Sequence, residues 1–167
     1  MFFVRSLSSC RVAPMLLLAS VATIGCTSRW IQLAPAPPLP VKRWQHRCIY
    51  SAPTRRMVLF GGKIPGNDYA DDVWVLQNAT GLGGSPKWVQ LFPGGPKPDG
   101  RHMPAAVYDS VNNRMIIFGG HSAGGLFVND VWVLQHANGL GGPATWIPLK
   151  PSGAPPSARE WHRPISC

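Results

Sequence analysis

Two stretches of the chain, RMVLFGG at Arg56–Gly62 and RMIIFGG at Arg114–Gly120, are nearly identical and lie 58 residues apart. At the same spacing, the stretch DVWVLQ at 72–77 recurs unchanged at 130–135. A shift of 58 residues over the whole unit gives 24 identities in 58 positions without a gap, far more than chance allows. The chain therefore contains two copies of one structural unit.

Each unit, 34–91 and 92–149, contains four short segments with the composition of β-strands. The second segment is a continuous apolar run that ends in a glycine doublet, which is typical of a strand buried on both faces. The four segments are 47–50, 57–62, 72–77 and 88–91 in the first unit, and 105–108, 115–120, 130–135 and 146–149 in the second. Outside the units, 30–33 matches the fourth segment as a single end-strand, and 150–167 matches the start of a third unit.

The composition agrees with this interpretation, because 18 glycines, 18 prolines and only 14% charged residues favour short strands joined by turns. Four antiparallel strands per unit, repeated in tandem, predict an all-β fold of β-propeller blades. The FGG doublet, the tryptophan in the third strand and the tryptophan that opens the fourth resemble the Kelch motif, as in the central domain of galactose oxidase. This resemblance implies a partial Kelch-type propeller over 27–167, with two complete blades and partial strands at both ends. The tandem units also resemble those of exported bacterial Kelch proteins.

The first 26 residues have the order of an export signal. Arg5 and Arg11 precede an apolar stretch that ends in TIGC at 23–26. This ending resembles a bacterial lipoprotein signal, in which Cys26 would carry the lipid, although Thr23 stands where an aliphatic residue is usual. An ordinary signal peptide is the alternative. We expect residues 1–26 to be a leader and the protein to reach the cell envelope or the exterior, with a possible lipid anchor to the membrane.

Residues that recur in both units are expected to hold the blades together. The glycine doublets end strands, where a side chain would clash with a neighbouring strand. The recurring tryptophans are expected to pack between blades, and the recurring arginines and aspartates to bond strand-end backbone or each other. These residues are Gly61, Gly62, Gly119, Gly120, Trp74, Trp88, Trp132, Trp146, Arg43, Arg101, Arg159, Asp72 and Asp130.

Residues that differ between the units are the better candidates for binding, because loops on a rigid scaffold commonly carry function. The copies diverge between their second and third strands, at 63–71 and 121–129. The binding candidates in these segments, which we interpret as loops, are Lys63, Asp68, Tyr69, His121 and Phe127. Trp44 and Trp161 lie outside the tryptophan columns and are candidates for surface contact.

The sequence offers no catalytic constellation. It contains no CxxC and no His/Cys cluster spaced for a metal, so we expect no catalytic residue, no metal and no cofactor. Cys48, Tyr50 and Tyr108 lie in the first strands and are expected in the core. The net charge of +9 comes from scattered basic residues, which argues against nucleic acid binding.

The function that these features favour is an exported, non-catalytic module that binds a protein or a glycan at the cell surface. One alternative is a fragment of an exported carbohydrate-active or galactose-oxidase-like enzyme, which would use copper. Another is a truncated gene product without independent function, because propellers close with about 4–8 blades. Open blade edges would then favour association.

Overall fold

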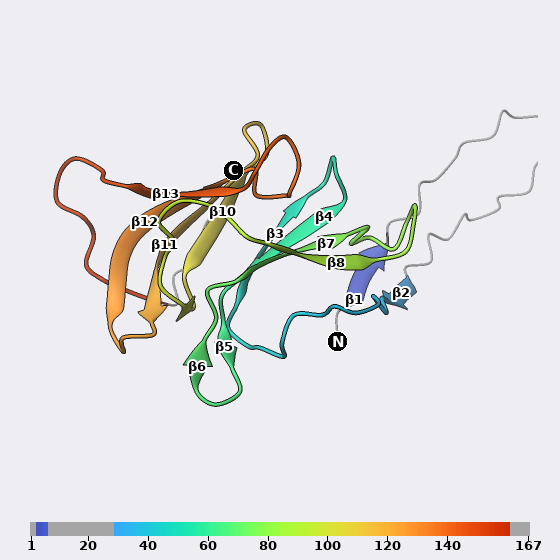
Figure 1. Cartoon of the computed structure of the whole chain (residues 1–167), viewed down its shortest axis with the longest axis horizontal. Coiled ribbons are helices and arrows are strands. Elements are labelled where there is room, and N and C mark those ends of the chain that lie inside the picture. Colours follow the sequence, from blue (N-terminus) through green and yellow to red (C-terminus); the bar gives the residue numbers. More distant parts are fainter. Residues whose placement is uncertain (1–2, 7–28, 161–167) are drawn as a thin grey trace, which may run out of the picture.

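The structure is a computed structural model that describes residues 3–6 and 29–160, with side chains from residue 30 onward (Figure 1). Every regular element in these residues is a β-strand. The described part of the chain therefore offers no helix that could cross a membrane.

The first unit folds into an antiparallel sheet whose strands follow one another in chain order. The strands are β3 (Arg47–Ser51), β4 (Arg56–Phe60), β7 (Val73–Gln77) and β8 (Lys87–Leu91). The apolar run of β4 is buried on both faces because a core lies on each side of the sheet, with Val58 and Phe60 in one and Leu59 in the other.

The second unit forms the same sheet from β10 (Ala105–Asp109), β11 (Arg114–Ser122), β12 (Phe127–Gln135) and β13 (Thr145–Leu149). Register is the same in both, since Trp74 faces Gln90 just as Trp132 faces Pro148. The four-stranded blades that the repeat predicts are thus confirmed.

The segments 63–71 and 121–129 are not simple loops, and that part of the sequence interpretation is wrong. In the first unit, β5 (Lys63–Ile64) pairs with β6 (Asp68–Tyr69) as a separate hairpin. In the second, β11 and β12 stay paired beyond an irregularity between Phe118 and Gly120. Continued pairing gives partners to backbone N–H and C=O groups that a loop would have to satisfy otherwise.

The chain enters each unit along the edge of these hairpins. In the second unit, the short strand β9 (Arg101–His102) pairs with the end of β11, so that His102 lies opposite His121. In the first unit, the equivalent contact is an isolated bridge between Trp44 and Lys63. The two entry segments are therefore equivalent in space as well as in sequence.

The expected end-strand at 30–33 is present as β2 (Arg29–Gln32). It pairs in antiparallel fashion with β1 (Phe3–Ser6), which lies in the segment expected to be a leader. Figure 1 shows this pair next to the β7–β8 side of the first unit. Cys26, the expected lipidation site, lies outside the described residues, as does Trp161.

The main core lies between the two blades. Phe60 of the first unit meets Trp146 of the second edge to face, with ring centroids 5.2 Å apart. Burial of apolar surface of this kind is the dominant favourable term in folding. The buried members of this core are Ile49, Val58, Phe60, Val73, Val75, Met115, Ile117, Leu134, Ala137 and Trp146, and the half-buried Trp132 packs against it.

The opposite face of the first blade has a core of its own. Trp74 and Trp88 are buried in it, and Leu33, from the segment after β2, packs against them. In the main core, Leu91 takes the equivalent place against the second blade. The leucine just before each linker thus packs against the tryptophan face of the blade that follows.

The recurring arginines fix the start of each unit. The buried Arg101 makes a two-pronged ion pair with Asp130, through Nη1–Oδ1 at 2.6 Å and Nη2–Oδ2 at 2.9 Å. Its Nη1 also donates to the carbonyl of Gly119. Arg43 makes the same contacts with Asp72 and with the carbonyl of Gly61.

The glycine doublets lie against these entry segments. Gly61 has a φ of +67°, and a β-carbon there would lie 2.6 Å from the carbonyl oxygen of Arg101. At Gly120, whose φ is +102°, a β-carbon would lie 2.8 Å from the carbonyl oxygen of His102. No residue with a side chain fits such a close approach of two backbones.

Candidate functional site

Two hairpins from different units end on the same side of the molecule. Figure 1 shows β5–β6 and the turn between β11 and β12 at one end of the sheets, with the β3–β4 and β10–β11 turns at the other. The entry segment at β9 runs between the two hairpins, because it pairs with β11 and accepts a hydrogen bond from the first unit (Gly62 N to Arg101 O, 2.8 Å). Side chains from three separate segments can therefore meet here.

The side chains that meet form what we call the loop-end cluster. The ring of Tyr69 stacks on that of His102, with centroids 5.0 Å apart and planes 9° apart. His121 lies edge-on to both rings, and Phe127 lies 5.2 Å from His121. The cluster consists of Lys63, Tyr69, His102, His121, Phe127 and Glu160.

Four of the five binding candidates from the sequence belong to this cluster. Besides Tyr69, His121 and Phe127, these include Lys63, whose ammonium lies over the Tyr69 ring, 5.8 Å from its centroid. Asp68 is exposed, and its carboxylate accepts a hydrogen bond from the backbone N–H of Tyr69, which shapes the hairpin. Cross-strand pairing explains much of this, since Lys63 lies opposite Tyr69 and His121 opposite Phe127.

Sequence reasoning missed two members, His102 and Glu160. Both stand one position after a recurring arginine, Arg101 or Arg159, as Trp44 does in the first unit. The sequence does mark this position as divergent, because it is Trp, His and Glu in successive units while the residue before it is always Arg.

The electrostatics of the cluster centre on a pair of imidazoles. His102 Nε2 and His121 Nδ1 lie 2.9 Å apart, so one ring donates a hydrogen bond to the other. His102 is 7% exposed. Burial, together with nearby His121 and Lys63, lowers the pKa of His102 against an opposing effect of Glu160. Burial thus favours the uncharged form of the His102 ring, which keeps a lone pair on one nitrogen.

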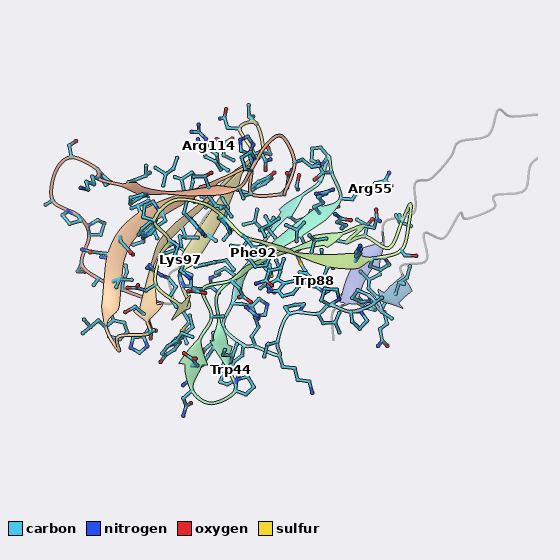
Figure 2. The ribbon with its side chains drawn as sticks, viewed as in Figure 1. Trp44, Arg55, Trp88, Phe92, Lys97 and Arg114 are labelled. Carbon is cyan, nitrogen blue, oxygen red and sulfur yellow. The ribbon has the colours of Figure 1, made fainter. Side chains whose placement is uncertain are left out.

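Exposed apolar side chains surround the cluster. At the tip of the β11–β12 hairpin, Leu126 is 67% and Phe127 55% exposed. Figure 2 shows Trp44, also exposed, beside the β5–β6 hairpin, whereas Arg55 and Arg114 lie toward the other end. Trp44 thus has the surface position expected of it. This end of the molecule combines aromatic and aliphatic contact surface with a buried polar centre.

Away from the loop-end cluster, a hollow with a volume of about 440 Å³ lies between the edge strands β3 and β10. Cys48 and Tyr50 line it and are exposed, so the expectation that they belong to the core is wrong. β3 is the edge strand of its sheet, and among the described residues no strand pairs with its outer edge. Tyr108 is half-buried against the main core and donates a hydrogen bond to Asn113. The lining of the hollow combines apolar side chains with the Cys48 thiol and the hydroxyl groups of Tyr50, Tyr108 and Ser110.

The fold defines a repeat protein built from four-stranded β-blades, with a candidate binding site at one end of the blades. Comparison with known proteins agrees, because the KLHDC2/KLHL20/DRC7 Kelch-repeats domain matches residues 21–166. The chain belongs to this family of Kelch-repeat domains.

Two curated proteins show what the chain is similar to. Over 106 residues, or 62% of this chain, it is 29% identical to dynein regulatory complex subunit 7 of Chlamydomonas reinhardtii. Over 148 residues, or 78% of this chain, it is 28% identical to an F-box/kelch-repeat protein of Arabidopsis thaliana. These matches span 8% and 30% of the lengths of the two relatives, so the similarity concerns the Kelch repeats and not the whole of either protein.

Proposed function

We propose that this chain is an exported, non-catalytic Kelch-repeat module that binds a protein ligand through the loop-end cluster. The observation that carries the proposal is the gathering of Tyr69, His121 and Phe127 from segments that differ between otherwise similar units. Aromatic side chains of this kind supply much of the binding energy at protein interfaces.

A protein is favoured over a glycan by the composition of the hairpin tip. Leu126 and Phe127 give an apolar surface that suits an apolar side chain of a partner. Lys63 and Glu160 add one charge of each sign at the rim, which suits the polar backbone and charged groups of a peptide segment. The similarity to a protein named as the subunit of a complex supports the same choice.

The test is binding by the purified chain to a displayed library of random peptides and, in parallel, to a glycan array. We expect enrichment of peptides, and loss of that binding in Tyr69→Ala and in Phe127→Ala. Val111→Ala is the matched control, because Val111 is exposed in the β10–β11 turn at the opposite end. Unchanged peptide binding in both cluster variants would overturn the proposed site, and binding to glycans alone would overturn the ligand class.

Export is a separate part of the proposal and rests on the order of residues 1–26. Removal of this segment would also remove β1, the partner of β2. A fusion of residues 1–30 to a periplasmic reporter should be exported from a bacterial host, with the reporter alone as control. Retention in the cytoplasm would refute the leader.

Lipidation of Cys26 is the more specific form of this proposal. Labelled palmitate should enter the wild-type chain and not Cys26→Ser, and the mass of the mature protein should show cleavage before residue 26. Labelling of both chains would refute Cys26 as the site of the lipid, and labelling of neither would leave an ordinary leader as the better interpretation.

A further inference from the structure

Three metal-ligating side chains converge in the loop-end cluster. One ligand atom from each of His102, His121 and Glu160 lies within 4.8 Å of the other two. They come from three separate segments, β9, the end of β11 and the start of the third unit, so that only the folded chain brings them together. From this convergence we infer that the loop-end cluster is a binding site for a divalent zinc-like ion, held by two imidazoles and one carboxylate.

The repeat shows that this combination is not required by the fold. At the equivalent positions of the first unit, Trp44 and Lys63 make the same backbone bridge that His102 and His121 make in the second. Neither an indole nor an ammonium group can ligate a metal ion. The blade therefore tolerates other side chains here, and packing alone does not explain why two histidines face each other.

The donor set determines the class of ion. Imidazole nitrogens suit zinc, copper, iron and nickel, whereas magnesium and calcium prefer sites made wholly of oxygen. Two histidines with one glutamate form a known type of zinc site, which leaves the fourth coordination position open.

The geometry requires only side-chain adjustment. Zn–N bonds of about 2.0–2.1 Å place two ligand atoms about 3.4 Å apart on a tetrahedral ion. The two imidazole nitrogens, now 2.9 Å apart, would separate slightly as their hydrogen bond is replaced by two metal bonds. The other distances, at most 4.8 Å, would have to shorten by no more than about 1.4 Å. His121 and Glu160 are half-buried and can make that movement.

The inference does not depend on the proposed protein ligand, since zinc binding is measured on the chain alone. The protein is the full chain with its four cysteines changed to serine, which excludes zinc bound by thiolates. Zinc chloride is titrated calorimetrically, and magnesium chloride serves as the control ion. We expect one zinc per chain, a higher melting temperature in zinc and no response to magnesium. In cobalt chloride, we expect the visible absorption of a site with nitrogen and oxygen ligands.

Matched variants separate a metal site from a structural hydrogen bond. Loss of an outer-shell partner of a metal costs about 10–100-fold in affinity, so removal of a ligand in His121→Ala or Glu160→Gln should cost at least about 100-fold. Glu160→Gln keeps the shape of the side chain and remains informative if His121→Ala folds poorly. His136→Ala, which removes a histidine outside the cluster, should bind zinc like the parent. Absence of zinc binding in the parent, or equal affinity in parent and Glu160→Gln, would overturn the inference.

Discussion

The two blades are alike at the arginines that fix the start of each unit and different at the loop end. Arg43 and Arg101 make the same contacts, whereas Lys63 of the first blade is replaced by His121 in the second. Positions at which the two units have the same residue thus form the scaffold, and positions at the loop end at which they differ form the candidate site.

A second difference between the blades concerns burial at identical positions. Phe60 and Phe118 are equivalent, yet Phe60 is fully buried between the blades and Phe118 is only half-buried on the outer face of the second blade. Val73 and Val131 differ in the same way. Each blade face is therefore buried by its neighbour and not by its own sheet, as expected of repeat proteins.

The largest expected effect tests this difference in burial. Phe60→Ala should lower the free energy of unfolding by about 3–5 kcal/mol, because it leaves a cavity beside Trp146. Phe118→Ala should cost about half as much, since part of its surface is already in contact with water. Urea unfolding of both variants provides the measurement, and equal losses would mean that the outer face is as well covered as the inner one.

The next effect tests the shared scaffold. Arg101→Ala should cost about 2–3 kcal/mol, because it removes the charged donor of Asp130 and a donor of the Gly119 carbonyl. The remaining hydrogen bond from the Trp132 indole and the partial exposure of Asp130 limit the loss. Arg43→Ala should have a similar cost. Arg55→Ala is the control and should cost less than about 0.5 kcal/mol, because Arg55 is exposed. If Arg101→Ala had only a small cost while Arg43→Ala had the expected one, the two equivalent sets of contacts would differ in energy.

The half-buried outer face predicts self-association. Residues 30–160 should form oligomers at high concentration, because Ile116, Phe118 and Val131 present apolar surface that the first blade buries at the same positions. Ile116→Lys should raise the concentration at the midpoint of association at least about tenfold, equivalent to 1.4 kcal/mol. Sedimentation at several concentrations measures this, with Val111→Lys as the control, and a monomer at all concentrations would refute the expectation.

The smallest expected effect is a dependence of stability on pH. Burial raises the pKa of Asp72 and Asp130, but hydrogen bonds from Arg43 and Trp74, or from Arg101 and Trp132, outweigh it and hold both values below the usual range. A carboxylate with a lowered folded-state pKa stabilises the fold above its unfolded pKa of about 3.9 and loses that contribution as pH falls further. Thermal unfolding should therefore give a melting temperature that drops below about pH 4, and less steeply in Asp130→Asn. An unchanged slope in that variant would assign the acid loss to other groups.

The sequence by itself determined the blades, because the 58-residue repeat, the apolar second strands and the recurring Arg, Asp, Gly and Trp are local or periodic features. It also pointed to most of the loop-end cluster, since four cluster residues lie in the segments that diverge. The position after each recurring arginine also diverges, but only the tertiary structure shows that His102 and Glu160, 58 positions apart, meet His121 through the packing of successive units. The sequence could not predict the difference in burial either, because Phe60 and Phe118 stand in the same local motif. The neighbouring blade decides which of these two identical side chains is covered.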